Sequence, residues 1–279
     1  MSTGAGSLGV FDSGLGGLTV LKEILRALPD ERAVYFGDTA RVPYGTKSKE
    51  TITRFSAENI RFLRAHDPET KMIVIACHTA SSLALDEMRR TFDLPVVGVV
   101  EPGAQKAVAQ TRNGRIGIIG TKSTIGSGAY ERAVRAAGPS VEVYGVACPL
   151  FVSLIEEGWT EGEVVEKVAE HYLKPLRDYD VDTVILGCTH YPILEDEIRR
   201  SLPDGVKLVN PAEEVAKLAR TMLADLGVAA PQGVGRNLRD RVEYFVSDEP
   251  ESFRILGQKF LGHPIPVVRK VNEIAISSN

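Results

Sequence analysis

The sequence has few of the features that would place a protein in a membrane, outside the cell or on nucleic acid. Three widely spaced cysteines in 279 residues form no disulfide framework, so we expect reduced thiols in the cytoplasm. No apolar run is long enough to cross a bilayer, which predicts no membrane partner. The first ten residues, MSTGAGSLGV, lack the basic and apolar segments of a signal peptide and predict a short disordered lead-in. The net charge of −4, with lysine and arginine scattered along the chain, predicts no nucleic-acid partner.

The composition is that of an ordinary soluble protein, 43% hydrophobic and 25% charged, long enough for one large or two medium domains. Short apolar runs alternate with amphipathic stretches, which predicts an α/β fold with doubly wound, mainly parallel sheets. The predicted strands are Leu8–Phe11, Ala33–Phe36, Met72–Ala76, Val96–Val99, Ile116–Ile119, Val141–Val146, Thr183–Leu186 and Lys207–Val209. The predicted helices include Leu18–Ala27, Lys49–His66, Ser81–Thr91, Ala129–Ala137, Glu163–Leu176, Leu194–Leu202 and Ala212–Leu226. A further strand, helix and strand follow near the end, in YFVSD, ESFRILGQKFLG and PVVRKV.

The chain contains an internal repeat. The glycine-led strand and turn GVFDSG has a counterpart in GIIGTK, and the strands that follow them lie in register. Cys77 follows Gly9 by 68 residues, and Cys188 follows Gly117 by 71. The repeat predicts two similar α/β domains related by a pseudo-twofold, residues 1–99 with 211–279 and residues 100–210. We expect the first boundary where Glu101-Pro102-Gly103 interrupts the pattern.

Two look-alike segments carry the most informative residues, Cys77 in KMIVIACHTASS and Cys188 in DTVILGCTHYPI. Each is a β-branched apolar run that ends in a thiol. Ligands of open α/β sheets bind beyond the carboxyl ends of the strands, where Asp12 and Thr121 are also expected. Two domains that face each other across a twofold would enclose one site, with a thiol on each side. Two opposed thiols are what a two-base proton transfer requires.

A cysteine taken alone is more often a small buried hydrophobe, and we interpret Cys148 in that way. Cys77 and Cys188 instead lie where a strand gives way to a helix, whose N-terminus favours negative charge and eases thiolate formation. His190 is placed to be an acid–base partner of Cys188, the alternative being a loop histidine bonded to backbone. His78 follows Cys77 directly and is expected to point toward a ligand rather than toward the thiol.

Metal binding and nucleotide binding are two alternative functions for these segments. Cys77, His78, Cys188 and His190 are zinc ligand types, but their spacing matches no known zinc motif. The glycine-rich loop FDSGLGG lacks the P-loop and dinucleotide fingerprints, so it predicts a small anion such as a carboxylate rather than a nucleotide. Asp12, at the start of that loop, is alternatively a helix N-cap.

Two more polar positions have ordinary alternatives. Tyr44-Gly45, in RVPYG, has the composition of a turn, and its tyrosine could close a pocket. Glu156 and Glu157 lie on a predicted helix, where solvent exposure alone would account for them.

Seven segments together resemble the cofactor-independent glutamate racemases of the aspartate/glutamate racemase superfamily. In family order they are GVFDSGLGGLTVL, GDTARVPYG, IACHTAS, VVGVVEPG, IGTKSTIGSGAY, CPLFVSLIEEG and LGCTHYP, and they run from Gly9 to Pro192. The last of them favours glutamate over aspartate racemases, which usually differ after the second cysteine.

The resemblance implies a reaction without pyridoxal phosphate, nucleotide or metal. Glutamate would lie between the domains, with its α-hydrogen between Cys77, which deprotonates D-glutamate, and Cys188, which deprotonates L-glutamate. Asp12 would support Cys77, and His190 would support Cys188. The resemblance further implies a cytoplasmic enzyme, commonly a homodimer, that supplies D-glutamate for peptidoglycan synthesis.

The resemblance also implies a set of substrate-binding residues. The carboxylates and the ammonium of glutamate would be held by Asp12, Ser13, Tyr44, Gly45, His78, Thr79, Thr189 and His190. Thr121 and Thr124 would add hydroxyl contacts. Either Glu156 or Glu157 would lie near the second thiol, and Glu156 is favoured.

One residue departs from the family pattern. The family usually has asparagine after its first cysteine, and this chain has His78. A neutral imidazole offers one donor and one acceptor, as an amide side chain also does, but it is bulkier and ordinarily titrates near neutrality. The departure therefore puts the substrate contact and the pH dependence at this position in question.

Three alternatives follow from these observations. His78 is compatible with a racemase of the same superfamily that acts on another amino acid. A non-catalytic amino-acid-binding protein would keep the two-domain cleft, but it has no use for two opposed thiols. A thiol redox protein would need adjacent thiols rather than thiols on either side of a ligand.

Overall fold

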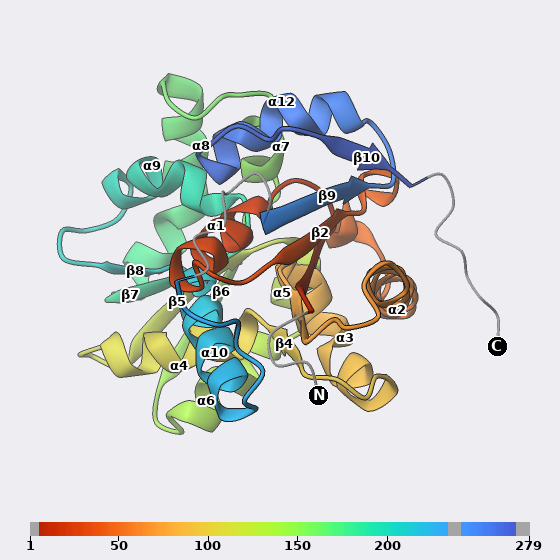
Figure 1. Ribbon diagram of the computed structural model, residues 1–279. Coiled ribbons are helices and arrows are strands. Elements are labelled where there is room, and N and C mark those ends of the chain that lie inside the picture. The colour runs from red at the N-terminus through yellow and green to blue at the C-terminus, as the bar shows by residue number, and fades with distance from the viewer. Residues whose placement is uncertain (1–5, 234–240, 272–279) are drawn as a thin grey trace.

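The computed structural model describes residues 6–233 and 241–271 and contains two parallel β-sheets surrounded by helices (Figure 1). The first sheet has the order β10-β9-β2-β1-β3-β4, and the second has the order β6-β5-β7-β8. All neighbouring strands pair in parallel, which confirms the predicted α/β class. The first-sheet strands are β1 (Leu8–Asp12), β2 (Ala33–Gly37), β3 (Met72–Ile75), β4 (Val96–Gly98), β9 (Val242–Val246) and β10 (Val268–Lys270). Those of the second are β5 (Arg115–Gly120), β6 (Glu142–Ala147), β7 (Thr183–Gly187) and β8 (Lys207–Val209).

The two sheets share one strand order, which matches the internal repeat of the sequence. The series β2-β1-β3-β4 of the first sheet corresponds to β6-β5-β7-β8 of the second, with β1 and β5 in equivalent central places. The strands β9 and β10, which come last in the chain, extend the first sheet. The division into residues 1–99 with 211–279 and residues 100–210 stays a prediction, because sheet membership does not measure independent folding. Residues 1–5 of the expected lead-in lie outside the described residues.

The helices match the sequence pattern closely, and α1 (Leu18–Ala27), α2 (Lys49–His66) and α6 (Ala129–Ala137) have the predicted bounds. The other α-helices are α3 (His78–Thr91), α4 (Val100–Gln110), α5 (Lys122–Gly126), α7 (Leu150–Glu156), α8 (Glu163–Asp178), α9 (Glu195–Arg200), α10 (Pro211–Asp225) and α12 (Pro250–Leu261). The 3₁₀ turns are η1 (Thr39–Arg41), η2 (Tyr44–Thr46) and η3 (Tyr191–Leu194).

The expected interruption at Glu101-Pro102-Gly103 was wrong, because these residues form the first turns of α4. Proline is tolerated at the start of a helix, where the backbone N–H has no intrahelical acceptor in any case. The chain therefore passes from the first sheet to the second through a helix. Helix α10 packs against both α1 and α4 and joins the helical layers of the two sheets (Figure 1).

The carboxyl ends of the two sheets face each other in the middle of the molecule. Hydrogen bonds join them: Thr19 Oγ1 donates to the Thr189 carbonyl at 2.9 Å, and Ser123 Oγ donates to the Gly45 carbonyl at 2.7 Å. Thr79 Oγ1 lies 3.0 Å from Thr121 Oγ1 and 3.3 Å from Thr124 Oγ1. The strands that end there, β1, β3 and β7, are buried along their whole length. Rigid strands therefore position whatever side chains follow them.

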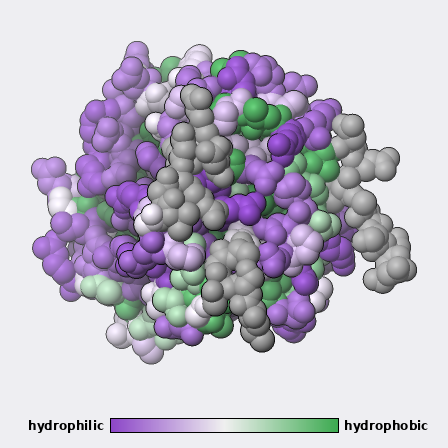
Figure 2. All heavy atoms as spheres, viewed as in Figure 1, coloured by the Kyte–Doolittle hydropathy of each residue, from purple (hydrophilic) through white to green (hydrophobic). Residues whose placement is uncertain are grey.

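The surface seen in Figure 2 is mainly hydrophilic, with apolar residues in scattered groups. Within residues 6–233 and 241–271, no helix is both long and apolar enough to cross a membrane.

Candidate active site

The first thiol lies at the end of β3, where Cys77 is the N-cap residue of α3. It is 5% exposed, and its Sγ lies 3.8 Å from the hydroxyl of Ser13. Asp12 ends the neighbouring strand β1 and is fully buried. Its Oδ2 accepts a hydrogen bond from the Gly14 N–H at 2.9 Å, whereas its Oδ1 has no partner among the described residues. The N-cap of α1 is Gly17, so the alternative that Asp12 caps this helix was wrong.

The surroundings of Cys77 oppose its ionisation. Burial and then the nearby charge of Asp12 raise the pKa of this thiol to about 12, although the Ala80 N–H at the start of α3 acts in the other direction. The helix N-terminus therefore eases thiolate formation at Cys77, as expected, but the net pKa of the thiol is raised. Desolvation and a neighbouring carboxylate outweigh the helix terminus, and the group is a protonated thiol at neutral pH.

The second thiol lies at the end of β7 and is also buried, with Cys188 6% exposed. The expected helix does not begin directly after it. A turn and the 3₁₀ segment η3, beginning at Tyr191, come before α9. His190 Nδ1 lies 3.8 Å from the Cys188 Sγ, and His190 Nε2 lies 3.0 Å from Glu156 Oε1. Glu156 is the last residue of α7, and Glu157 follows it as the C-cap. Of the two candidate glutamates, Glu156 is thus the one in contact with His190.

His190 is an imidazolium in this arrangement. Burial alone would lower its pKa, but hydrogen bonds with Cys188 and Glu156 raise the pKa of His190 to about 10. The ring of Phe260 from α12 packs edge-on against it, with centroids 5.4 Å apart. A charged hydrogen-bond donor therefore lies beside Cys188, with the ring of Phe260 packed against it.

His78 lies at the start of α3, 3% exposed. Neither of its ring nitrogens has a hydrogen-bond partner among the described residues, and the same holds for the hydroxyl of Tyr130, whose ring stacks on His78 with centroids 6.2 Å apart. Burial, together with the charge of His190, lowers the pKa of His78 to about 3. The expectation of titration near neutrality was therefore wrong, and His78 is a neutral imidazole at physiological pH.

Three threonine hydroxyls meet between the two sheets. Thr79 Oγ1 lies 3.0 Å from Thr121 Oγ1 and 3.3 Å from Thr124 Oγ1, and the last two lie 2.9 Å apart. Thr121 is also the N-cap of α5. Thr189, 5% exposed, lies between Cys188 and His190. Hydroxyls from both halves can therefore donate to one anionic group between them.

The tyrosine of the Tyr44-Gly45 pair does not close a pocket with its hydroxyl. Tyr44 is 1% exposed, donates to Asp38 and accepts a hydrogen bond from Asn59 Nδ2 at 3.1 Å. Gly45 instead lies against Thr121, which follows β5 of the second sheet. A Cβ added to Gly45 would lie 2.8 Å from the Cβ of Thr121. The glycine is required by this close approach.

The four zinc-type residues do not form a metal site. Among residues 6–233 and 241–271, no three His, Cys, Asp or Glu side chains gather in positions that could hold a metal ion. Cys188 and His190 are in contact with each other, while His78 has no hydrogen bond to either among the described residues.

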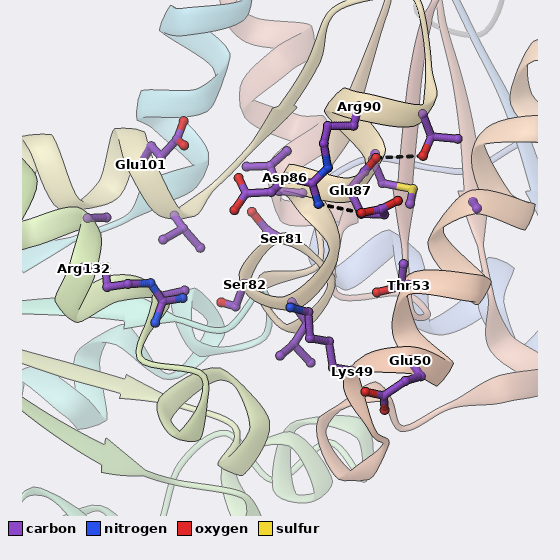
Figure 3. A pocket seen from close by; sticks show the side chains of 18 of the residues that line it. Lys49, Glu50, Thr53, Ser81, Ser82, Asp86, Glu87, Arg90, Glu101 and Arg132 are labelled. Carbon is purple, nitrogen blue, oxygen red and sulfur yellow. Dashed lines mark hydrogen bonds and ion pairs between the residues drawn. The ribbon is translucent and has the colours of Figure 1, made fainter.

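A groove on the surface lies away from the two thiols. It has a volume of about 1220 Å³ and runs between α2, α3, α4 and α6, and neither Cys77 nor Cys188 lines it. Figure 3 shows its charged walls, with Lys49 on one side and Arg132 on the other. The thiols are instead enclosed between the two sheets.

Sequence reasoning did not single out Asp38, Arg41, Tyr130 or Phe260. Three of these lie within segments that carry the family resemblance, GDTARVPYG and IGTKSTIGSGAY, but their roles depend on contacts with distant residues. Phe260 lies on α12, 70 residues beyond the histidine it touches, and no local pattern marks it.

Comparison with known proteins adds independent information to this geometry. The profile of the Asp/Glu/hydantoin racemase family matches residues 8–219. The glutamate racemase of Geobacter metallireducens is 51% identical over 266 residues, covering 95% of this chain and 96% of the relative. That of Aquifex aeolicus is 46% identical, covering 92% and 95% respectively.

Solved structures agree. Glutamate racemase isoform RacE1 from Bacillus anthracis superposes with a TM-score of 0.90 at 36% identity, covering 96% of this chain and 98% of that one. The glutamate racemase from Francisella tularensis, solved in complex with D-glutamate, has a TM-score of 0.87 at 37% identity, with the same coverage. The chain therefore belongs to the Asp/Glu/hydantoin racemase family, among its glutamate racemases, and is an amino-acid racemase.

Proposed function

We propose that the chain interconverts L- and D-glutamate by a two-thiol proton transfer at Cα. The observation that carries this proposal is the pair of buried cysteines at the ends of equivalent strands, β3 and β7, in two sheets whose carboxyl edges face each other. Each thiol has a different acid–base neighbour, Asp12 for Cys77 and His190 for Cys188.

In the L-to-D direction, a thiolate at Cys188 takes the α-proton, and the thiol of Cys77 gives its proton to the opposite face of Cα. The α-carbon is inverted, Cys188 ends as a thiol, and Cys77 ends as a thiolate. The reverse direction exchanges these roles. The His190 imidazolium is placed to donate a hydrogen bond to the Cys188 thiolate before each L-to-D turnover.

The bound substrate itself assists Cys77. Its ammonium would lie beside the unpartnered Oδ1 of Asp12 and oppose the charge that raises the Cys77 pKa. A substrate carboxylate would accept hydrogen bonds from Thr79, Thr121 and Thr124, while His78 and Thr189 would complete the contacts together with Ser13 and the Tyr44–Gly45 backbone. Fixed donors in a water-excluded site stabilise the carbanion-like transition state.

The proposal requires no pyridoxal phosphate, nucleotide or metal. It places the enzyme in the cytoplasm, as a homodimer that supplies D-glutamate for peptidoglycan synthesis, as the similarity to glutamate racemases suggests. Size-exclusion chromatography with light scattering tests the dimer.

The decisive experiment is incubation of the purified protein with L-glutamate in D₂O, without cofactor. We expect loss of optical rotation together with deuterium at Cα, unchanged by a chelator. Absence of exchange with any acidic amino acid would overturn the catalytic proposal and favour a binding protein. Exchange with aspartate but not with glutamate would favour the alternative substrate, and loss of activity in chelator that zinc restores would revive the metal hypothesis.

A further inference from the structure

A buried network centred on Arg41 lies beside the proposed site. Arg41 is the last residue of η1, and its Nε donates to both carboxylate oxygens of Asp38, at 2.9 and 2.7 Å. Its Nη1 donates to Glu58, and its Nη2 donates to the Asn59 side-chain oxygen at 3.0 Å. The guanidinium also lies 4.0 Å above the ring centroid of Phe55. One side chain therefore joins the end of β2 to the middle of α2.

The network is shielded from water. The side chain of Asp38 is 0% exposed, that of Glu58 is 4% exposed and that of Arg41 is 21% exposed. Buried charges are tolerated only when they are paired and hydrogen-bonded, so each group holds the others in a single geometry. Replacing the guanidinium would leave two buried carboxylates without their cationic partner.

The same residues hold Tyr44. Its hydroxyl donates to Asp38 and accepts from Asn59, which are two of the residues that bind Arg41. Ser247, at the end of β9, adds a hydrogen bond of 3.0 Å to Asp38. The short segment from Arg41 to Tyr44 is thus attached at both ends to one set of buried partners.

The next residue reaches the other half of the molecule. The Gly45 carbonyl accepts from Ser123 Oγ at 2.7 Å, and Gly45 lies against Thr121, one of the three clustered threonines. The position of Tyr44 therefore determines where the first half meets the hydroxyl cluster.

We propose that Arg41 is a positioning residue for substrate binding. It holds the Tyr44–Gly45 segment close to Thr121 and Ser123, so that groups following both sheets can bind one carboxylate of the substrate. This inference rests on the proposed function, since it names what that site needs in order to bind. Arg41 acts through the Tyr44–Gly45 backbone, whereas the thiols are held by β3 and β7 on their own.

The test is steady-state kinetics and direct glutamate binding for Arg41→Gln and for Tyr44→Phe, which removes only the hydroxyl. We expect Arg41→Gln to raise KM and the dissociation constant about tenfold or more with kcat within about threefold, because uniform binding is lost while the chemical step is kept. Tyr44→Phe should shift KM in the same direction by a smaller factor.

Arg54→Gln is the matched control. Arg54 also lies over the Phe55 ring, at 5.1 Å, but it is exposed and has no hydrogen bond or ion pair with Asp38, Glu58 or Tyr44 in the described structure. Its KM should be unchanged.

Unchanged KM in a folded Arg41→Gln variant, or a fall in kcat alone, would overturn the inference. If Arg41→Gln does not fold, Tyr44→Phe decides the question. A wild-type protein that binds glutamate without racemising it would contradict the proposed function, but the binding constants would still test Arg41.

Discussion

The surroundings of Cys77 and Cys188 differ although the strands that carry them are equivalent. Cys77 caps an α-helix directly and lies beside the buried carboxyl of Asp12, which helps to raise its pKa to about 12. Cys188 is followed by a turn and lies beside His190, whose pKa is raised to about 10 through Cys188 and Glu156. One thiol lies beside a carboxyl group whose pKa is raised by burial, and the other lies beside an imidazolium.

This difference shows that the repeat supplies a symmetric frame while the side chains supply opposite electrostatics. A two-base racemase begins each turnover with one thiolate and one thiol. In the proposed mechanism, the imidazolium beside Cys188 and the Asp12 carboxyl group beside Cys77 would distinguish these two roles before substrate binds. The predictions below test this asymmetry.

The largest effect is expected from removing either thiol. Cys77→Ser and Cys188→Ser should each lower the rate of racemisation by about 10³-fold or more, because a hydroxyl is a far weaker base than a thiolate. Optical rotation measures the loss. The remaining thiol should still exchange one α-hydrogen with D₂O, that of D-glutamate in Cys188→Ser and that of L-glutamate in Cys77→Ser.

Cys148→Ser is the control for thiol removal, because the Cys148 thiol donates to the Val146 carbonyl and has no hydrogen bond to Cys188 or His190 among the described residues. It should keep its activity. Full racemisation in either of the other two variants would refute the two-thiol assignment.

A smaller effect is expected from Glu156→Gln. The His190 imidazolium is present below its pKa and is lost as the pH rises through about 10. Removal of the Glu156 carboxylate should lower this pKa, so the alkaline limb of kcat/KM should move to lower pH. Because the Glu156 side chain is 45% exposed and screened by solvent, we expect a shift of about one unit.

Glu157→Gln should leave that limb in place, since Glu157 has no hydrogen bond to His190 in the described structure. A limb that stays unmoved in Glu156→Gln, or moves equally in both variants, would contradict the assignment of Glu156.

The smallest effect on activity is expected from His78→Asn, within a few-fold near pH 8. Its effect on stability should depend on pH. An unfolded His78 takes up a proton below about 6.5, whereas the folded state resists protonation down to about 3. The contribution of His78 therefore lowers the free energy of unfolding of the wild type as the pH falls from about 6.5 to about 3, by up to about 1.4 kcal/mol per pH unit.

Urea unfolding at pH 5 and 7.5 tests whether His78 lowers the stability of the wild type at the lower pH. His78→Asn should gain stability relative to wild type at the lower pH, whereas His171→Asn, at an exposed position on α8, should not. Parallel pH profiles for His78→Asn and wild type would show that His78 is protonated in the folded state.

Much of the fold could be predicted from the sequence because local periodicity determines it. The bounds of α1 and α2 were predicted to the residue, since amphipathic spacing and end signals such as Ser48 lie within the helix itself or beside it. Helix α4 was missed because Pro102 and Gly103 read as a break, and only the position of Pro102 in the first turn makes it harmless.

The residues of the site could be predicted from the sequence, but their protonation states and contacts could be predicted less well. The motifs named the cysteines, Asp12 and His190, because each follows a recognisable strand. The net rise in the pKa of Cys77 was not predicted, because the local rule considers the helix terminus, which does lower the pKa, and omits burial. The engagement of Tyr44 by Asp38 and Asn59 was missed because it depends on a partner one helix away.

The sequence by itself determined the α/β class, the repeat and the two thiols at strand ends, because apolar periodicity and motif order are properties of neighbouring residues. The tertiary structure alone decided which glutamate meets His190, that His78 is neutral, and that Arg41 and Tyr44 share Asp38 and Asn59 as hydrogen-bond partners. These outcomes depend on desolvation and on hydrogen bonds between segments far apart in the chain, and both are established only when the two sheets face each other.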